Sequence, residues 1–456
     1  MADSYNHLGL FTDLYELTMA AAYFENKFTA KASFELFVRS LPRERSFLLS
    51  AGLDQALEYL ENVRFGDEEI EYLRRQPVFR QVSDGFFDYL RDFRFTGEVW
   101  AVPEGTPVFG EEPLLRVTAP IIQAQVVETF LLSTLTFQTM IASKAARVVG
   151  TAERRNVVEF GSRRAHGPGA GLLAARASYI GGCAGTSNVE AGRRFGIPVF
   201  GTMAHSFVMA YAKEEEAFQR FQQLFPEHSV LLIDTYATLT AIDKIIQKKL
   251  RPTAVRLDSG DLLDLAVRVR RKLDEAGLNQ TRIFASGDLD EFTIADLLAR
   301  GAPIDAFGVG TALATSKDAP TLGGVYKLVD LESETGILYR AKFSEEKVTY
   351  PGPKQIFRFP DAAGTYRRDI IGRQSEKYSD AVCLLELVMR DGQRVAPSPR
   401  IEEVQRRASE ELKKIPAICR RLRDATPYPV TFSRDLENLL ATVRQQTLKV
   451  AEAEYS

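Results

Sequence analysis

Short loops rich in glycine, hydroxyl and acidic residues recur through the middle of this sequence, and their residue types suit a phosphorylated ligand. In chain order they are 161–164, 181–188, 201–206, 234–236, 258–261, 286–288 and 308–311. Glycines let an anion approach backbone N–H groups, and hydroxyl and arginine side chains add donors. Aspartates can bind sugar hydroxyls or a Mg²⁺ that also bridges phosphates. The set predicts a phosphorylated sugar as substrate.

Several of these side chains also have a purely structural explanation. Asp261 and Asp288 can cap the helices that follow them, and residues 308–311 can form only a tight turn. The others are His205 as a structural histidine, Arg163 and Arg164 as a solvated pair, and Asp13 and Tyr15 as the start of a helix. Seven polar loops at one rim are hard to explain by packing alone, and this favours ligand binding.

The apolar runs before these loops predict the strands that position them. The runs are 157–160, 177–180, 197–200, 230–233, 254–257, 283–285 and 304–307, and their ends lie 20 to 33 residues apart, the length of one β-loop-α unit. After the run at 254–257, Leu262, Ala266, Val269 and Leu273 keep helical spacing. Seven such units predict an α/β fold with an irregular (β/α) barrel, whose functional loops follow the strand ends.

The flanking segments predict a second domain. Their patterns indicate a helix at 54–61, short strands within 95–117, a long helix at 121–148, strands at 337–343, 355–359 and 382–389, and helices near 402–422 and 436–451. We therefore expect the barrel at 120–329. A β-rich α+β domain is expected from the N-terminal segment, 1–119, and the C-terminal segment, 330–456.

Composition excludes several classes of protein. Lys and Arg total 58 against 61 for Asp and Glu, so the chain lacks the basic excess of a nucleic-acid coat. No segment approaches the roughly 18–20 uncharged apolar residues of a membrane span. The three cysteines form no CxxC pair and the four histidines show no metal-ligand spacing. With no basic start before an apolar run, we expect a cytoplasmic protein without nucleic-acid or membrane partners.

Six short motifs together resemble one known family. They are FTDLYELTM at 11–19, EFGSRR at 159–164, GTSNV at 185–189, GTMAHS at 201–206, RLDSGD at 256–261 and GVGT at 308–311, with a weaker PGPKQ at 351–355. In content and order they resemble the nicotinate phosphoribosyltransferases, which are type II phosphoribosyltransferases containing a barrel. Each motif is modest by itself, whereas the set is specific.

The resemblance implies a reaction and its cofactors. Nicotinate and 5-phosphoribosyl 1-pyrophosphate would give nicotinate mononucleotide and pyrophosphate, coupled to ATP hydrolysis with Mg²⁺, as the entry step of NAD salvage. His205 would be transiently phosphorylated by ATP, since a neutral imidazole nitrogen is a competent nucleophile when its other nitrogen is held by a hydrogen bond. Mg²⁺ would bind to the pyrophosphate, with Asp288 as its candidate protein ligand.

The resemblance also implies how nicotinate is bound. The pyridine ring would stack between Phe160 and Tyr15, and Tyr15 would come from the neighbouring subunit of a homodimer. Arg256, with Thr202 nearby, would hold the carboxylate. Arg163 would support the base site or the ribose phosphate.

The phosphoribosyl half of the site follows in the same way. Asp258 and Ser259 would face the ribose hydroxyls, so that His205, Asp258 and Arg256 form the implied catalytic set. The remaining implied substrate-binding residues are Asp13, Ser187, Gly287, Gly308, Gly310 and Thr311, with the last four around the 5-phosphate.

Four alternative functions fit the sequence less well than nicotinate phosphoribosyl transfer. Nicotinamide-using relatives carry an acidic residue at the position of Ser187, where it would repel a carboxylate, so Ser187 favours the acid. Quinolinate-decarboxylating relatives lack GTMAHS and the FTDLYELTM opening. A barrel aldolase or isomerase needs a Schiff-base lysine or a Glu base, and only Glu159 comes near. A non-catalytic paralogue would have lost His205 or Asp258.

Overall fold

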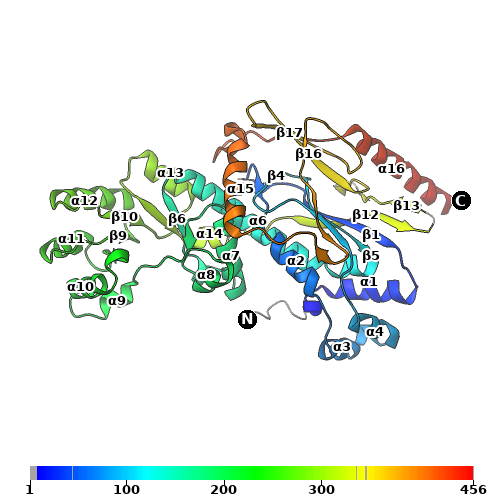
Figure 1. Cartoon of the computed structure of the whole chain (residues 1–456), viewed down its shortest axis with the longest axis horizontal. Coiled ribbons are helices and arrows are strands. Elements are labelled where there is room, and N and C mark those ends of the chain that lie inside the picture. Colours follow the sequence, from blue (N-terminus) through cyan, green and yellow to red (C-terminus); the bar gives the residue numbers. More distant parts are fainter. Residues whose placement is uncertain (1–7, 44, 335, 345–346, 455–456) are drawn as a thin grey trace. The chain divides into compact units, whose positions relative to one another are not determined.

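The computed structural model describes residues 8–43, 45–334, 336–344 and 347–454, which form two compact units (Figure 1). The first unit contains residues 1–139, 321–400 and 406–456, and the second contains 140–320 and 401–405. The sequence predicts domain boundaries at 119/120 and 329/330. The compact units do not test where independently folding domains begin and end, so these boundaries stay a prediction. The ends of those predicted segments, at 1–7 and 455–456, lie outside the described residues.

The second unit is built on a parallel sheet. Within the described ranges it has six strands in the order β7-β6-β11-β10-β9-β8. The strands are β6 (Asn156–Glu159), β7 (Gly185–Thr186), β8 (Val230–Leu232), β9 (Ala254–Leu257), β10 (Arg282–Ala285) and β11 (Ala306–Val309). All neighbouring pairs are parallel, and a single parallel bridge adds Val199 beside Thr186. Parallel pairing carries every strand's carboxyl end to one edge, the carboxyl edge of the sheet.

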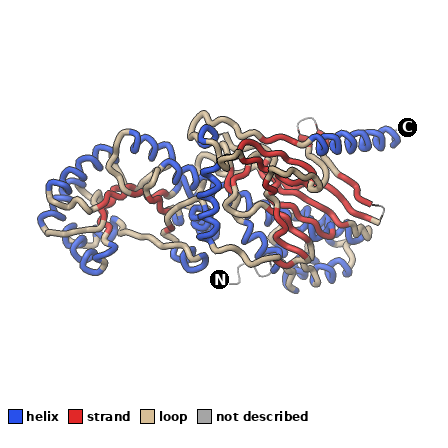
Figure 2. Tube along the Cα trace, turned by 45° about the horizontal axis from the view of Figure 1, so that its top comes forward, coloured by secondary structure: helices blue, strands red, loops and turns tan. Residues whose placement is uncertain are grey.

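Helices surround these strands, as Figure 2 shows. They are α7 (Pro168–Ile180), α8 (Val189–Phe195), α9 (His205–Met209), α10 (Glu214–Leu224), α11 (Thr238–Gln247), α12 (Leu262–Glu275), α13 (Glu291–Ala299) and α14 (Thr311–Ala314), with short 3₁₀ turns at Ser162–Arg164 and Pro226–His228. In α12 the predicted spacing is confirmed, because Ala266, Val269 and Leu273 are fully buried. Gly277 follows the helix at φ +73°, which a glycine adopts without strain.

Two of the seven predicted strands are wrong. Residues 177–180 are the end of α7, where Ala177, Tyr179 and Ile180 are buried. A short apolar run cannot distinguish a buried strand from a buried helix, and Pro168 at the helix start was the overlooked signal. Residues 197–200 make only the bridge at Val199, while the two-residue strand β7 was not predicted.

The first unit is mainly antiparallel. One sheet has the order β13-β12-β1-β5-β3-β19-β20 and a second has the order β18-β16-β17-β21. The strands are β1 (Lys31–Val38), β2 (Leu48–Leu49), β3 (Glu98–Ala101), β4 (Pro107–Val108), β5 (Pro113–Pro120), β12 (Gly324–Ser333), β13 (Gly336–Tyr339), β14 (Phe343–Ser344), β15 (Lys347–Val348), β16 (Lys354–Pro360), β17 (Tyr366–Arg373), β18 (Val382–Cys383), β19 (Glu386–Arg390), β20 (Gln393–Arg394) and β21 (Val430–Phe432). N- and C-terminal segments thus share one sheet, and β1 pairs with both β5 and β12. The predicted fold class, a barrel with a β-rich second part, is confirmed.

Helices of the flanking segments occur where the sequence predicts them, but several begin or end at other residues than predicted. Those within the first unit are α1 (Leu14–Glu25), α2 (Leu53–Asn62), α3 (Asp67–Arg74), α4 (Asp84–Arg91), α5 (Ile121–Val126) and α16 (Arg434–Glu454), with 3₁₀ turns at Leu8–Leu10, Pro77–Phe79 and Ala417–Arg420. Two helices have residues in both units: α6 (Glu128–Thr151) continues into the second unit after Thr139, and α15 (Ile401–Lys414) begins there and continues into the first unit after Gln405. The helix predicted at 121–148 breaks at Val127. The helix predicted at 402–422 stops before Pro416, which cannot donate a backbone hydrogen bond.

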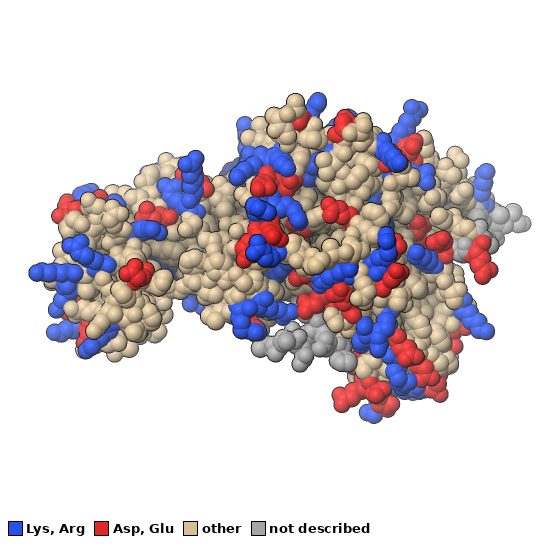
Figure 3. Space-filling model, in the orientation of Figure 1, with Lys and Arg blue, Asp and Glu red and all other residues tan. Residues whose placement is uncertain are grey.

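The surface carries both signs of charge side by side. Figure 3 shows Lys and Arg interspersed with Asp and Glu over the face in view, in keeping with a net charge of -3. Across the part of the chain that the structure describes, no helix combines the length and apolar character needed to span a bilayer.

Candidate active site

The carboxyl edge of the parallel sheet gathers most of the predicted site residues. Phe160 and Arg163 follow β6, Ser187 follows β7, and Asp258 and Ser259 follow β9. Gly287 follows β10, Gly310 and Thr311 follow β11, and Thr202 and His205 follow the bridge at Val199. Asp13 and Tyr15 belong to the first unit.

Arg256, inside β9, is held by hydrogen bonds on every side. Its Nε donates to Ser286 Oγ at 2.8 Å, one Nη donates to Thr202 Oγ1 at 2.8 Å, and the other donates to Asp258 Oδ1 at 2.7 Å. The residue is only 9% exposed, and its guanidinium carbon lies 5.6 Å from the Phe160 ring centroid. A buried, fixed guanidinium beside an aromatic face suits a flat anion such as an aromatic carboxylate.

Asp258 is charged and serves as the anchor of this cluster. Its Oδ1 accepts from Arg256 and from Ser286 Oγ, the latter at 2.5 Å. Burial alone would raise the pKa of Asp258, but the hydrogen bond from Ser286 and the charge and hydrogen bond of Arg256 outweigh it. The pKa therefore lies below its ordinary value, and the carboxylate stays ionised at neutral pH.

His205 begins α9 and presents one free ring nitrogen. Its Nδ1 is 3.1 Å from Thr235 Oγ1, and its Nε2 is 3.8 Å from Asp258 Oδ2. The side chain is 41% exposed. An imidazole held by a hydrogen bond at Nδ1, on a partly exposed side chain, has the arrangement that a nucleophilic histidine needs.

Phe160 stands over a cavity that enters the sheet. The cavity has a volume of about 840 Å³ and runs from Phe160 and Thr202 down to the strand beginnings at Ala254 and Arg282. Its walls are mostly small or apolar, and Phe284 lies 5.6 Å from the Phe160 ring. Barrel interiors are usually filled by side chains, so an open interior of ligand size indicates a binding site.

Glycines are required at two predicted positions because of close packing. A Cβ on Gly308 would lie 2.7 Å from the Phe160 ring, so this glycine makes room for the aromatic face from within β11. Gly287 has φ +89°, and a Cβ there would lie 2.1 Å from the Asp258 carbonyl oxygen. Gly310 and Thr311 open α14 at the end of β11. Of the four residues predicted around the 5-phosphate, Gly308 therefore lies against the Phe160 ring. Gly287, Gly310 and Thr311 follow strand ends.

The remaining predicted residues differ in how firmly they are held. Ser187 N–H donates to the Glu159 carbonyl oxygen at 2.9 Å, and Ser259 Oγ donates to Asp234 Oδ2 at 2.6 Å. Arg163 is exposed and makes no hydrogen bond to a described residue. Asp288 is also exposed. The capping explanation holds for Asp261, which accepts from two N–H groups of α12, whereas α13 is capped by Asp290 and not by Asp288.

Tyr15 lies in a cluster of acidic groups in the first unit. Its hydroxyl is 3.5 Å from Glu128 Oε1, and Gln125 Nε2 donates to carboxylates of both Glu16 and Glu128. Burial, followed by the charge of Glu16, raises the pKa of Glu128 to about 7. Asp13 receives a hydrogen bond from Thr129 at 2.9 Å. The Tyr15 side chain itself is 49% exposed, so its ring is open to a ligand or another chain.

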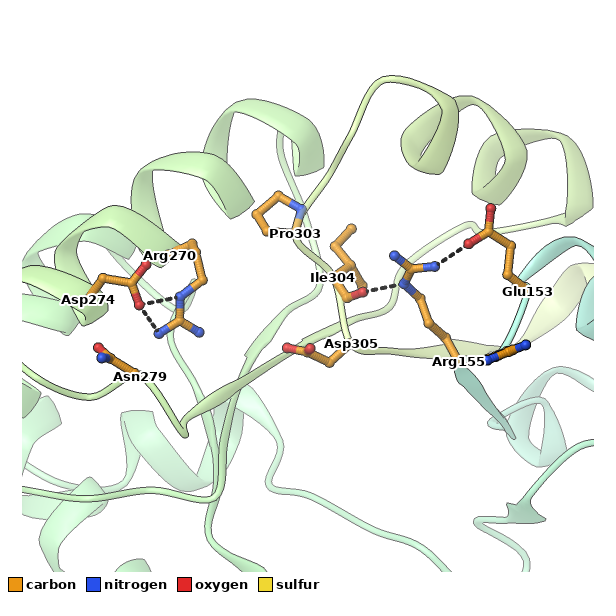
Figure 4. Close-up of a pocket in the computed structure, with 9 residues that line it drawn as sticks. Glu153, Arg155, Arg270, Asp274, Asn279, Pro303, Ile304 and Asp305 are labelled. Carbon is orange, nitrogen blue, oxygen red and sulfur yellow. Dashed lines mark hydrogen bonds and ion pairs between the residues drawn. The ribbon is translucent and has the colours of Figure 1, made fainter.

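A second cavity lies at the amino ends of the strands, which the first cavity also reaches, and lacks the aromatic ring and polar groups of the carboxyl edge. Its volume is about 810 Å³, and it is lined by residues that precede β6, β10 and β11 (Figure 4). Arg270 donates to the carbonyl oxygens of Thr281 and Leu278, and Arg155 donates to that of Ile304. Backbone carbonyls thus occupy both guanidinium groups, which favours a structural role for them.

Sequence reasoning assigned no individual role to Ser286 or Thr235, and it indicated Asp234 only as one of the loop aspartates that can bind sugar hydroxyls or Mg²⁺, yet the structure brings all three into the site. Ser286 orients Arg256 and Asp258, Thr235 contacts His205, and Asp234 accepts from the Asp258 N–H at 2.9 Å. The repeat of Ser-Gly-Asp at 259–261 and 286–288 was the available signal for Ser286. Among the described residues, no group of three or more His, Cys, Asp or Glu is arranged to hold a metal ion.

Comparisons with known proteins identify the class. Three family models match successive parts of the chain. They are the nicotinate phosphoribosyltransferase N-terminal domain at residues 10–136, the quinolinate phosphoribosyl transferase C-terminal domain at 141–319 and the nicotinate phosphoribosyltransferase C-terminal domain at 373–440. The fold and its carboxyl edge are thus those of a barrel-containing phosphoribosyltransferase.

Whole-chain relatives narrow the class to one family. A nicotinate phosphoribosyltransferase of Mycobacterium tuberculosis is 46% identical, with 96% of this chain and 94% of the relative aligned. One from Bacillus subtilis is 39% identical over 94% and 93%. The crystal structure of the human nicotinic acid phosphoribosyltransferase superposes with a TM-score of 0.83 at 29% identity, covering 94% of this chain and 99% of that one. The chain belongs to the nicotinate phosphoribosyltransferase family of enzymes, which confirms the resemblance found in the motifs.

Proposed function

We propose that this enzyme converts nicotinate and 5-phosphoribosyl 1-pyrophosphate into nicotinate mononucleotide and pyrophosphate, coupled to ATP hydrolysis, in the salvage of nicotinate to NAD. The observation that carries the proposal is the buried Arg256 guanidinium, fixed by three side chains beside the Phe160 ring. It offers a positive charge to a carboxylate and an aromatic face to a pyridine ring at the same place.

Nicotinate would stack on Phe160 with its carboxylate toward Arg256 and Thr202. Tyr15 of the partner subunit would cover the other face of the ring in a homodimer with shared sites, and its half-exposed side chain is available for this. Asp13, two residues before Tyr15, would help to place that helix end. Arg163, exposed at the rim, would support the base site or the ribose phosphate.

The phosphoribosyl donor would lie across the strand ends of β9, β10 and β11. Asp258 and Ser259 would face the ribose hydroxyls, and Gly287, Gly310 and Thr311 would surround the 5-phosphate through backbone N–H groups. Gly308, which makes room for the Phe160 ring, would contribute to that loop mainly by its lack of a side chain.

At the ribose C1, the bond to pyrophosphate would break as the pyridine nitrogen forms a bond from the opposite face, through an oxocarbenium-like state. The nitrogen already has a free lone pair, so no side chain needs to remove a proton. When bound, Mg²⁺ supplies charge that stabilises the departing pyrophosphate. Asp234 fits such an ion, because its buried Oδ1 accepts no hydrogen bond from a described residue, and the exposed Asp288 offers a second carboxylate.

His205 would couple ATP to this reaction. Its Nε2 would attack the γ-phosphorus of ATP, forming an N–P bond as the bond to the ADP oxygen breaks, and water would later cleave the phosphohistidine to release phosphate. Thr235 at Nδ1 would hold the ring, and Asp258 Oδ2 lies 3.8 Å from Nε2, the proposed nucleophilic atom.

Nicotinamide phosphoribosyltransferase activity is the alternative, and a neutral Ser187 speaks against it. Steady-state rates with nicotinate, nicotinamide and quinolinate, each with and without ATP, test the proposal. We expect turnover of nicotinate with ADP formation and at least about 100-fold lower kcat/KM for nicotinamide, the size of effect that a missing carboxylate contact to a buried arginine produces. A preference for nicotinamide or quinolinate would refute the proposal.

A further inference from the structure

Glu159, the last residue of β6, is a buried carboxylate without an ionic partner. Its side chain is 0% exposed, and among the described residues no Lys, Arg or His lies within ion-pair distance of it. Burial raises the pKa of Glu159, while hydrogen bonds from Thr186 and Gly161 oppose that rise. Such a group is costly unless its oxygens are fully used.

Both carboxylate oxygens are used, and each binds a different loop of the site. Oε1 accepts from the backbone N–H of Gly161, in the loop that carries Phe160 and Arg163. Oε2 accepts from Thr186 Oγ1 at 2.6 Å, immediately before Ser187. Thr186 Oγ1 also accepts from the Asn188 N–H at 3.0 Å, so the contact with Glu159 continues to the residue after Ser187. Glu159 therefore connects the two loops through its two side-chain oxygens.

Two further contacts join the same loops. The Glu159 carbonyl oxygen accepts from Ser187 N–H, and Asn188 Nδ2 donates to Ser162 Oγ at 3.1 Å. Gly161 is also packed tightly, since a Cβ there would lie 2.3 Å from the Ala314 Cβ of α14. The position of Phe160 relative to Ser187 thus depends on a short chain of bonds that starts at Glu159.

We propose that Glu159 is a positioning residue, which fixes the spacing between the Phe160 ring and Ser187 and so sets the affinity for the pyridine substrate. The inference rests on the proposed function. Glu159 touches no reacting atom, and neither Gly161 nor Thr186 belongs to the glycine loops proposed for the 5-phosphate. Its loss should therefore act on nicotinate and spare the phosphoribosyl donor.

Three variants test the role. Glu159→Gln keeps the shape but provides one acceptor oxygen where two donors need one each. Thr186→Val removes the hydroxyl donor at the same size, and Thr186→Ser keeps it. For Glu159→Gln and Thr186→Val we expect the KM for nicotinate to rise about tenfold, the worth of one hydrogen bond to a charged group, with kcat and the KM for the phosphoribosyl donor within about twofold. Thr186→Ser should restore the wild-type KM.

The double variant adds a check on the mechanism. Since both changes act on the contact between Glu159 and Thr186, Glu159→Gln combined with Thr186→Val should raise the nicotinate KM by less than the product of the two single effects. The inference is overturned if Thr186→Val leaves the nicotinate KM unchanged, if both KM values rise together, or if Thr186→Ser behaves like Thr186→Val. Thr186→Val and Thr186→Ser decide the matter even if Glu159→Gln does not fold. A wild-type protein that does not turn over nicotinate would instead refute the proposed function.

Discussion

Asp258 and Glu128 are both carboxylates with limited exposure, yet their pKa values are shifted in opposite directions. Asp258 faces Arg256 and Ser286, and its pKa is held below the ordinary value. Glu128 faces Glu16, and its pKa is raised to about 7. The difference shows that the neighbours of a buried acid decide its protonation, because burial acts in the same direction on both. At the parallel sheet the pKa of the acid is lowered by Ser286 and Arg256, whereas beside Tyr15 burial and a second carboxylate raise it.

Removing the charged acid should produce the largest effect. Asp258→Ala leaves Arg256 without its carboxylate partner and removes the proposed ribose contact. We expect kcat/KM to fall on the order of 10³-fold, as truncation of one member of a buried, hydrogen-bonded charge pair does. Steady-state kinetics with nicotinate measure it.

Arg154→Ala is the matched control for Asp258→Ala. Arg154 is an exposed residue that lines the cavity of Figure 4 at the other end of the strands. Its loss should leave kcat/KM within about twofold, because exposed charges far from a site contribute little. An Asp258→Ala enzyme that retains more than a tenth of the wild-type value would contradict the assignment of Asp258.

Loss of His205, which lies beside Asp258, should have the second-largest effect, and this effect should be on ATP hydrolysis. His205→Ala should abolish ATP hydrolysis and most of the ATP-stimulated rate, while an ATP-independent rate remains, because the proposed nucleophile is gone. Thr235→Val should lower ATP hydrolysis by about tenfold through loss of the hydrogen bond at Nδ1. ADP release per nicotinate mononucleotide formed is the measurement. Full coupling in His205→Ala would rule out a phosphohistidine at this position.

The acid with the raised pKa should affect stability more than catalysis, and the effect should be small. A pKa raised from 4.5 to about 7 means that the folded state holds a proton that the unfolded state releases. This stabilisation is complete below pH 4.5 and disappears as the pH rises through about 7. Glu128→Gln should therefore be more stabilising, relative to wild type, at pH 8 than at pH 5, by about a few degrees in Tm.

Melting curves of wild type, Glu128→Gln and the exposed control Asp288→Asn over this pH range test the sign. If the Tm difference between Glu128→Gln and wild type is the same at pH 5 and pH 8, the carboxyl group does not hold a proton in the folded state.

The sequence was a good guide where side-chain chemistry is local. Five of the seven predicted strands form, since short runs such as 230–233 (VLLI) and 254–257 (AVRL) end in polar loops, and the GTMAHS and RLDSGD motifs place His205 and Asp258 at one edge. It could not reveal interactions between distant positions. The contacts of Arg256 with Thr202 and Ser286 span 54 and 30 residues, and nothing in either segment alone indicates them. The raised pKa of Glu128 likewise depends on Glu16, which is far away in sequence.

The strand order of the parallel sheet has a consequence for solubility. The edge strands β7 and β8 have two and three residues, whereas the inner strands have four each. An edge strand presents unpaired backbone groups on which another chain can add a strand, and shortness is one way in which proteins prevent that. At β7 the Thr186 backbone is also already bonded to Pro198 and Phe200, so the short strand β8 and this bridge both limit edge-to-edge pairing of the sheet.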